Sequence, residues 1–341
     1  MTQQKITIDN PFRGTESFPM PADIPVPSIR ADLAQGLLSR CPAYRQTPLV
    51  DHIDPTSGAR LFFKDERDRM GLGSFKALGA AYVIAHTAQH QDVSQTTFVT
   101  ASAGNHGLSV AAGAKVFGAR AVVYLSNTVP AGFAKRLNDL GAQVVREGDD
   151  YAASMQAAQD AAAAQGWTLL SDSSWPGYTE LPHRLMEGYQ VLAAETVEQM
   201  PQPPTHIFLQ AGVGGLAAAA ASYFRHAWGD APSIIVVEPD AAPALHHAIV
   251  AGEFVSTQGP VSSMGRLDCK EASLIALKGL ARDADHFVLM SDTAVEEQLP
   301  TLAGWGLATS ASGGAGCAAA LAGLRPLGPT DRVLCIISEG E

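Results

Sequence analysis

Apolar segments of two kinds alternate along the chain. Short runs rich in Val, Ile, Leu and Phe predict buried strands, and between them small apolar residues recur at helical spacing. We expect strands at 61–64, 97–101, 121–125, 143–147, 168–170, 206–211, 233–238, 286–290 and 332–337. We expect helices at 28–39, 106–117, 131–140, 151–165, 181–199, 211–221 and 313–324. The rest of the first fifty or so residues is proline-rich and is predicted to be irregular.

Strand–helix units therefore repeat through most of the chain, and their strands are apolar throughout rather than alternating. Such strands are typical of parallel sheets that helices cover on both faces. We predict an α/β fold with two three-layer lobes, each built on a parallel sheet. A proline cluster at 200–204 indicates a linker. We expect a smaller α/β domain at 92–200, inserted into a large domain formed by 1–91 and 201–341.

Composition narrows the classes of partner. The chain has 341 residues, of which 46% are hydrophobic and 17% charged, and its net charge is −11. Because lysine and arginine form no cluster, we expect neither nucleic acid nor an anionic membrane as a partner. The stretches 211–221 and 313–324 are too short to span a bilayer, and we predict that they form buried helices.

The N-terminal residues and the spacing of the cysteines indicate the cellular compartment in which we expect the protein. Met1–Lys5 lead into polar sequence, so we expect no signal peptide. The four cysteines are dispersed and form no Cys-x-x-Cys pair. This spacing favours a reduced, cytoplasmic protein without a zinc site or a disulfide framework.

Lys76 is the most informative single residue. It lies in Gly-Ser-Phe-Lys at 73–76, after the predicted strand at 61–64 and at the start of a helix that runs to about residue 90. A desolvated lysine near a helix N-terminus can lose its proton and act as a Schiff-base nucleophile. Taken singly, it could equally be a helix lysine with a solvated amine.

A second segment, Ser-Ala-Gly-Asn-His-Gly at 102–107, connects a predicted strand to a predicted helix. Its small residues allow backbone N–H groups to face a carboxylate or a phosphate, and Asn105 could donate a hydrogen bond in the same cleft. Ser102 could instead be a hydrolytic nucleophile. That elbow requires Gly-x-Ser-x-Gly, however, and Thr100 occupies the first position. The sequence therefore disfavours a hydrolase.

A third segment, Gly-Val-Gly-Gly-Leu-Ala at 212–217, follows the predicted strand at 206–211 and begins a helix. Glycines at a helix N-terminus allow the backbone to approach a phosphate. The segment also fits the dinucleotide pattern G-x-G-x-x-A, with Glu238 where a ribose-binding acid belongs. An NAD(P)-dependent oxidoreductase is thus an alternative, and so is a tight turn without a ligand.

A fourth segment, Cys-Ile-Ile-Ser-Glu-Gly-Glu at 335–341, places Ser338 at the carboxyl end of the last predicted strand, where α/β sheets bind ligands. In order and spacing, the four segments resemble the fold-type II pyridoxal-phosphate enzymes, the superfamily of the tryptophan synthase β-subunit and the serine/threonine dehydratases. The resemblance covers nearly the whole chain beyond about residue 40. It implies pyridoxal 5′-phosphate as cofactor, the two-lobed architecture of that superfamily, a small amino-acid substrate and a homodimer.

The resemblance also implies a set of site residues. Lys76 would hold the cofactor as a Schiff base, and Asn105 would bond its 3′ oxygen. Ser338 would contact the pyridine nitrogen. The phosphate would be cradled by the backbone of Gly212, Val213, Gly214, Gly215 and Leu216. The turn that binds the substrate carboxylate would be formed by Ser102, Ala103, Asn105 and His106.

Within the superfamily, the chain most resembles the diaminopropionate ammonia-lyases. The likeness lies in Asp-Ser-Ser-Trp-Pro-Gly-Tyr-Thr-Glu-Leu-Pro at 172–182, in Met-Glu-Gly-Tyr at 186–189 and in the loops at 264–269 and 312–316. By this resemblance Asp172 is catalytic. Read from the residues alone, an aspartate before two serines could also close a turn.

Two departures from that pattern concern the substrate. Ala103 stands where the ammonia-lyases carry an acid that serves the D-isomer, so we expect preference for an L-substrate. Ala311 stands where a second acid is expected. A site that lacks two acids is poorly suited to a cationic β-amino group, and it favours a neutral or anionic β-substituent.

The function expected from the sequence is α,β-elimination on a small β-substituted L-amino acid, giving a 2-oxo acid and ammonia. A 2,3-diaminopropionate-like substrate follows from the resemblance. Serine/threonine or hydroxyaspartate dehydration and β-replacement are alternatives within the same superfamily. An NAD(P)-dependent oxidoreductase and a catalytically silent binding protein are alternatives from other classes.

Overall fold

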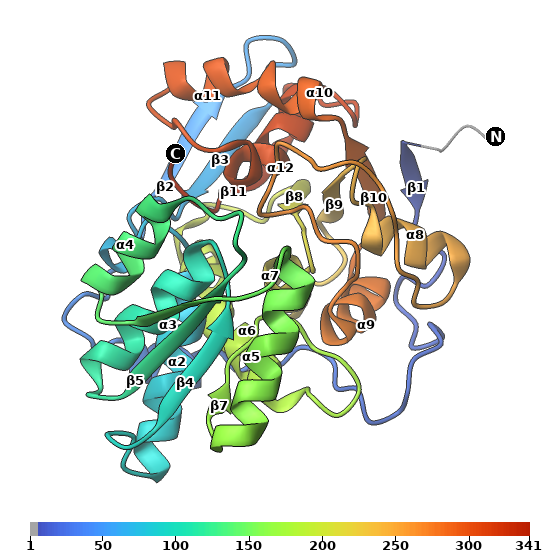
Figure 1. The fold of residues 1–341 in the computed structure, drawn as a ribbon. Helices are drawn as coiled ribbons and strands as arrows, with labels where there is room; N and C mark the ends of the chain where they lie inside the picture. Colours follow the sequence, from blue (N-terminus) through green and yellow to red (C-terminus); the bar gives the residue numbers. More distant parts are fainter. Residues whose placement is uncertain (1–5) are drawn as a thin grey trace.

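The computed structural model describes residues 6–341; Met1–Lys5, to which the expectation about a signal peptide refers, lie outside this range. Its backbone forms two β-sheets of unequal size (Figure 1). In spatial order the large sheet contains β1 (Thr7–Asp9), β10 (His286–Met290), β9 (Ser233–Pro239), β8 (His206–Gln210), β11 (Arg332–Ile337), β3 (Arg60–Asp65) and β2 (Leu49–Ile53). Its inner strands are parallel, whereas β1 and β2 pair antiparallel at the two edges.

The small sheet is parallel throughout. Its spatial order is β6 (Gln143–Arg146), β5 (Arg120–Leu125), β4 (Thr97–Ala101) and β7 (Thr168–Leu169). All its strands come from one continuous part of the chain, which leaves the large sheet after β3 and returns to it at β8. The proposed boundaries at 91/92 and 200/201 stay a prediction.

Helices cover both faces of the large sheet. One face packs against α10 (Asp292–Glu296), α11 (Leu299–Gly304) and α12 (Ala311–Leu321). The other face is covered by α1 (Ala31–Leu38), α6 (Glu180–Gln199), α7 (Gly215–Trp228), α8 (Ala244–Ala251) and α9 (Leu274–Asp283). Strand β3 shows why both faces are apolar, because Leu61 and Phe63 enter one core whereas Phe62 enters the other.

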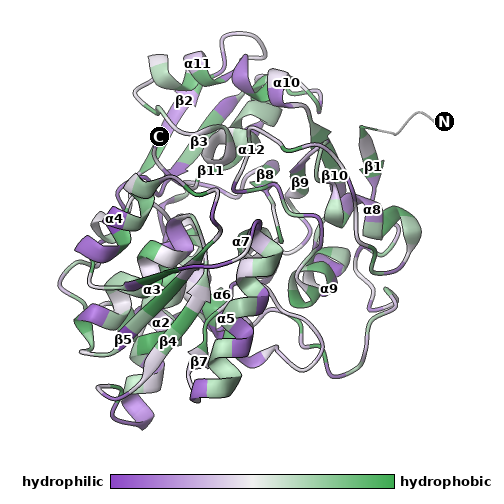
Figure 2. Ribbon diagram, in the orientation of Figure 1, coloured by the Kyte–Doolittle hydropathy of each residue, from purple (hydrophilic) through white to green (hydrophobic). Residues whose placement is uncertain are grey.

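The helices of the small sheet are α2 (Lys76–His90), α3 (Asn105–Val116), α4 (Ala131–Asp139) and α5 (Tyr151–Gln165); a 3₁₀ turn, η1 (Arg69–Gly71), precedes α2. Helix α5 packs on β4 and β5, where Met155 meets Val99 and Val122. Helix α2 lies between α3 and α6 and so joins the two parts of the molecule. The strands are mostly hydrophobic, and hydrophilic residues gather on the outward sides of the helices (Figure 2).

The predicted fold class is confirmed, and the predicted strands match those observed to within about two residues at each end. The prediction that the N-terminal region is irregular was wrong in two places, because β1 pairs with β10 and β2 pairs with β3. Both are edge strands whose side chains are partly exposed, so they carry no continuous apolar run. Within residues 6–341, no helix combines the length and the apolar character that a membrane span requires.

Two glycines set the position of α2 against α6. A Cβ added to Gly188 would lie 2.6 Å from the carbonyl oxygen of Leu78, and one added to Gly79 would lie 2.5 Å from the ring of Tyr189. Any larger residue would separate the two helices. Since α2 begins at Lys76, this close crossing fixes the start of the helix that bears the lysine.

A buried ion cluster joins α6 to β3 and η1. Glu195 accepts hydrogen bonds from Lys64 Nζ at 2.7 Å and from Arg69 at 2.6 and 2.8 Å, and all three side chains have no exposed surface. Arg69 also pairs with Glu66. Burial lowers the pKa of Lys64 despite the nearby Glu195, so the carboxylate is needed to keep this amine charged.

We expect Glu195→Ala to lower the free energy of unfolding by about 3–5 kcal/mol, because the buried Lys64 loses its ion-pair partner and the buried Arg69 keeps only Glu66. The measurement is urea unfolding followed by circular dichroism. Glu198→Ala is the matched control, since Glu198 lies on the same helix but is exposed. A change of less than about 1 kcal/mol in the Glu195 variant would contradict the role given to the cluster.

Candidate active site

The amine of Lys76 meets the carboxylate of Asp172 at a distance of 2.5 Å. The two residues are 96 positions apart in sequence, and each side chain keeps about a fifth of its surface exposed (21% and 19%). The amine also lies 5.1 Å from the ring centre of Phe75 and 5.6 Å from that of Tyr189. Lys76 therefore sits in a partly open, aromatic-lined position with an acid in direct contact.

The loop that carries Asp172 is held at several points. Ser174 Oγ bonds Ser273 Oγ at 2.7 Å and accepts the N–H of Ile275 at the start of α9. Tyr178 Oη accepts the N–H of Ser171 at 3.0 Å and donates to the carbonyl of Leu169 at 2.8 Å. The Ser-Ser-Trp-Pro-Gly-Tyr sequence thus folds the loop onto itself and onto α9. Asp172 is presented toward the lysine by this loop.

The charges of the pair stabilise each other. Burial alone would lower the pKa of Lys76, but the carboxylate of Asp172 raises it above its usual range. Burial alone would raise the pKa of Asp172, and the charge of Lys76 holds it well below its usual range. We expected a lysine that loses its proton through desolvation, and this was wrong for the free amine. The reason is that the carboxylate of Asp172 keeps the amine protonated, and this residue is 96 positions away in the sequence.

The glycine segment lies directly against this pair. Gly214 adopts a positive φ of 95° and caps α7, which begins at Gly215. A Cβ on Gly215 would lie 3.8 Å from the carbonyl oxygen of Asp172 and 3.8 Å from the Tyr189 ring. A Cβ on Gly212 would meet the backbone of Leu267 at 3.0 Å. The predicted strand–loop–helix geometry is therefore present, and its helix begins beside Asp172 and Tyr189.

The turn at 102–107 begins α3, as expected. Ser102 Oγ accepts the N–H groups of Gly104 and Gly107 at 3.2 and 3.1 Å. It therefore serves to fold the turn, and no histidine activates it among the described residues, so the geometry does not support a hydrolase. His106 is buried, with Nε2 2.8 Å from the carbonyl oxygen of Leu170. Ala103 is exposed on the same turn.

The end of β11 connects this turn to the lysine. Ser338 is buried, and its carbonyl accepts the N–H of Phe75 at 3.1 Å, one residue before Lys76. The next residue, Glu339, accepts the side-chain amide of Asn105 at 2.5 Å and Arg266 Nη1 at 2.8 Å. Ser310 also donates to this carboxylate. Glu339 thus fixes the orientation of Asn105.

Sequence reasoning assigned no role to Glu339 or Arg266. Glu339 follows Ser338 at the carboxyl end of a buried parallel strand, and that position was a usable signal. Arg266 lies in the loop at 264–269, which carries part of the family resemblance, but only the folded chain brings its side chain to the asparagine turn. Cys269 lies in the same loop, and burial, with Asp172 nearby, raises the pKa of its thiol to about 12.

Glu238 cannot serve as a ribose-binding acid. Its side chain is fully buried, and its two oxygens accept the N–H groups of Leu245 and His246 at 2.8 and 2.7 Å. It caps α8 from inside the protein. Burial raises its pKa to about 8. The feature that favoured a dinucleotide site is therefore structural.

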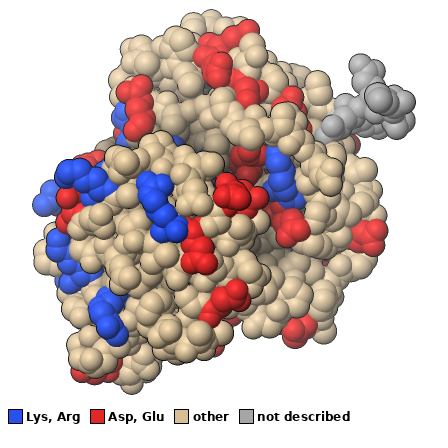
Figure 3. Space-filling view, in the orientation of Figure 1, with Lys and Arg blue, Asp and Glu red and all other residues tan. Residues whose placement is uncertain are grey.

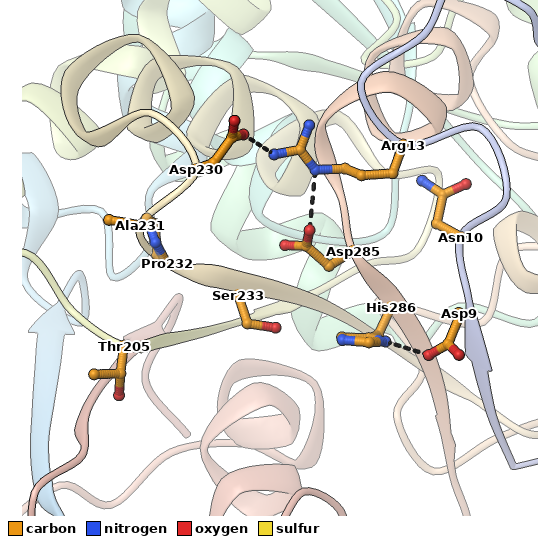
Figure 4. A pocket seen from close by; sticks show the side chains of 10 residues that line it. All are labelled: Asp9, Asn10, Arg13, Thr205, Asp230, Ala231, Pro232, Ser233, Asp285 and His286. Atoms are coloured by element: carbon orange, nitrogen blue, oxygen red, sulfur yellow. Dashed lines mark hydrogen bonds and ion pairs between the residues drawn. The ribbon is translucent and has the colours of Figure 1, made fainter.

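A cavity of about 370 Å³ lies elsewhere, at the amino ends of β8, β9 and β10 (Figure 4). Arg13 pairs there with Asp230 and, at 3.0 Å, with Asp285, and His286 bonds Asp9 at 2.8 Å. Parallel α/β sheets bind ligands at the carboxyl ends of their strands. This hollow is at the opposite end, and its charged groups are already paired.

The residues around Lys76 fit a phosphorylated aldehyde cofactor. A primary amine that is only partly buried can form a covalent bond with an aldehyde. The first N–H groups of α7 have no partner within the helix, and among residues 6–341 no hydrogen bond uses the N–H groups of Gly212 and Gly214. An acid for proton transfer is in contact with the amine.

Comparison with known proteins agrees with this geometry. Residues 41–339 match the family described as pyridoxal-phosphate dependent enzyme. Diaminopropionate ammonia-lyase of Escherichia coli K12 is 32% identical over an alignment 313 residues long, which covers 84% of this chain and 76% of that protein. L-Threonine ammonia-lyase of Geobacter sulfurreducens is 26% identical, over 87% of this chain and 71% of that protein.

A solved structure of the E. coli diaminopropionate ammonia-lyase in complex with D-serine superposes with a TM-score of 0.87 at 28% identity. The match covers 98% of this chain and 93% of that one. It therefore extends over both sheets and over every segment that surrounds Lys76. The chain belongs to the pyridoxal-phosphate dependent enzymes, and its cofactor is pyridoxal 5′-phosphate.

Proposed function

We propose that this protein is an ammonia-lyase that eliminates a β-substituent from a small L-α-amino acid and yields a 2-oxo acid and ammonia. The observation that carries the proposal is the contact of 2.5 Å between Lys76 Nζ and Asp172 Oδ2 beside the glycine segment. Elimination needs a base at Cα and an acid at the β-substituent, and this contact supplies one candidate for each.

When bound, pyridoxal phosphate supplies the electron-withdrawing ring that stabilises negative charge at Cα. The protein supplies the proton chemistry. We assign the removal of the Cα proton to Lys76 Nζ and the protonation of the leaving group to Asp172 Oδ2. The alternative, in which Asp172 only closes a turn, is not supported, because Ser174 and Tyr178 hold the loop while the aspartate points to the amine.

The charge state of Asp172 depends on Lys76. While the ammonium is 2.5 Å away, the pKa of the carboxyl is held low. Burial acts in the opposite direction, so the pKa rises whenever Nζ is engaged elsewhere and no longer carries its charge. Asp172 can therefore hold a proton at the stage when a leaving group needs one.

The remaining contacts are proposals from the resemblance and the geometry together. The backbone of Gly212, Val213, Gly214, Gly215 and Leu216 would hold the phosphate, Asn105 the 3′ oxygen and Ser338 the pyridine nitrogen. The turn of Ser102, Ala103, Asn105 and His106 would bind the substrate carboxylate. In support, the N–H groups of Asn105 and His106 at the start of α3 carry no hydrogen bond among residues 6–341, whereas that of Gly107 is taken by Ser102 Oγ.

The experiment that tests the function is a panel of β-substituted amino acids, each offered as L- and D-isomer and assayed for oxo-acid release. We expect release from at least one L-substrate and a rate for its D-isomer lower by roughly 10²-fold or more, because Ala103 cannot accept a proton. The carboxylate of Glu339, which lies at this turn, already accepts a hydrogen bond from Asn105.

Equal rates for the two isomers would contradict the assignment of stereochemistry to Ala103. Release from none of the substrates would contradict the lyase and favour a silent binding protein. The panel also distinguishes amine, hydroxyl and other leaving groups, which separates a diaminopropionate-like substrate from the dehydratase alternatives. The homodimer and the cytoplasmic location stay proposals that rest on the resemblance and on the unpaired cysteines.

A further inference from the structure

Arg266 places a positive charge at the asparagine turn. Its Nε lies 3.9 Å from the position that a Cβ on Gly104 would occupy, and its Nη1 bonds Glu339 at 2.8 Å. Its main-chain N–H donates to Ser312 Oγ at 3.1 Å, and its carbonyl lies against Gly212. The backbone of Arg266 is thus fixed beside the glycine segment, while its side chain extends over the turn that begins α3.

The guanidinium retains free hydrogen-bonding capacity. Nearly half of the side chain is exposed (45%), whereas that of Glu339 is almost fully buried (5%). Among residues 6–341, the side-chain hydrogen bond of Arg266 is made by Nη1, which leaves Nε and Nη2 for a ligand. An arginine oriented by a carboxylate, with two donors in the open, is well suited to a second carboxylate.

The acids at the site leave no place for a cationic substituent. Asp172 is assigned to proton transfer to the leaving group, and Glu339 already accepts from Asn105, Arg266 and Ser310. On the face of the molecule drawn in the space-filling view, acidic and basic residues are spread out rather than gathered in one acidic patch (Figure 3). The free hydrogen-bond donors over the turn are those of the Arg266 guanidinium, which carries a positive charge and so favours an anionic ligand.

We propose that the substrate carries an anionic group on its β-carbon, besides its α-carboxylate, and that Arg266 binds this β-group. The substrate class is then a small L-amino dicarboxylate with a β leaving group. This inference rests on the proposed function. For a β-hydroxy dicarboxylate the atoms balance as follows. Cα gives its proton to Lys76, and the hydroxyl leaves as water with a proton from Asp172. The enamine that is left becomes an imine as a proton moves from nitrogen to Cβ, and one water then hydrolyses the C=N bond, which leaves a 2-oxo dicarboxylate and ammonia.

The first arm of the test compares two substrates with the same leaving group. L-Serine and the L-isomers of 3-hydroxyaspartate differ only in the β-carboxylate. We expect Arg266→Gln to lower kcat/KM for hydroxyaspartate by roughly 10- to 100-fold and to change that for serine by less than about 3-fold. Arg60→Gln is the control, since Arg60 is a half-exposed arginine paired with Asp51 at the edge of the large sheet.

Equal losses for both substrates would overturn the inference and assign Arg266 to the α-carboxylate. A loss of cofactor affinity in Arg266→Gln would assign it to the phosphate and would overturn the inference in the same way. Arg266→Lys separates charge from geometry, and we expect it to recover only part of the activity on hydroxyaspartate.

The second arm measures binding without turnover, by calorimetry on the cofactor-loaded enzyme. We expect succinate to bind more tightly than propionate, and Arg266→Gln to remove this difference. Equal affinities in the wild-type enzyme would overturn the inference. If succinate is preferred but no amino acid in the panel yields an oxo acid, the anion site stands and the proposed lyase activity is wrong.

Discussion

Replacing Lys76 by alanine is expected to abolish oxo-acid release, with a loss of about 10³-fold or more, because the residue serves as both attachment point and base. The same variant should lose the yellow colour that borohydride removes from the wild-type enzyme. Circular dichroism should be unchanged, since the side chain lies at the edge of the core and is partly exposed. Steady-state assays and absorbance spectra of the purified proteins measure both effects.

Lys135→Ala is the matched control. Lys135 is also a helix lysine paired with an aspartate, but its side chain is 76% exposed. We expect it to behave as the wild type. A Lys76→Ala protein that keeps a borohydride-sensitive colour would remove Lys76 from its role, whatever its activity.

Asp172→Asn is the second variant with a large expected effect. We expect it to bind the cofactor as the wild type does and to lose turnover by about 10²–10⁴-fold, the usual contribution of a positioned proton donor. Asparagine has the same shape but cannot deliver a proton to a leaving group. The loop should stay folded, because Ser174 and Tyr178 hold it through groups that the substitution leaves intact.

Two measurements make this prediction specific. Absorbance titration gives the affinity for the cofactor, and oxo-acid release gives kcat. Asp139→Asn, in an exposed ion pair on α4, is the control. Turnover at the wild-type rate in Asp172→Asn would show that the aspartate closes a turn and that the acid lies elsewhere.

Much of the fold could be predicted from the sequence because the inner strands are buried on both faces. The predicted strands at 286–290 and 332–337 match the structure at both ends. The edge strands could not be predicted in the same way. In β2 the polar residues Asp51 and His52 interrupt any apolar run, and its pairing with β3 depends on a partner that the local sequence does not specify.

Part of the candidate site could likewise be predicted from the sequence, and part could not. Segments with several small residues in sequence, such as the glycine segment and the asparagine turn, can be found without a structure. Contacts between single residues cannot. Asn105 and Glu339 are 234 positions apart, and the pairing of Arg266 with Glu339 depends on how a loop crosses the end of β11.

The pKa of Lys76 shows the same limit. The helix start and the aromatic neighbours suggest a neutral amine. The amine is instead charged, because the carboxylate of Asp172 is distant in sequence but lies 2.5 Å away in space. Its charge outweighs the effect of burial on the pKa of Lys76. An argument from local environment alone misses the charge that decides the protonation state.

Peptide mapping identifies the lysine that forms the covalent bond with pyridoxal phosphate. The purified enzyme is reduced with borohydride and digested, and the peptide that carries the pyridoxyl group is identified by mass spectrometry. We predict a single modified peptide with the group on Lys76. A pyridoxyl group on another lysine, or none on a protein that contains the cofactor, would contradict the account.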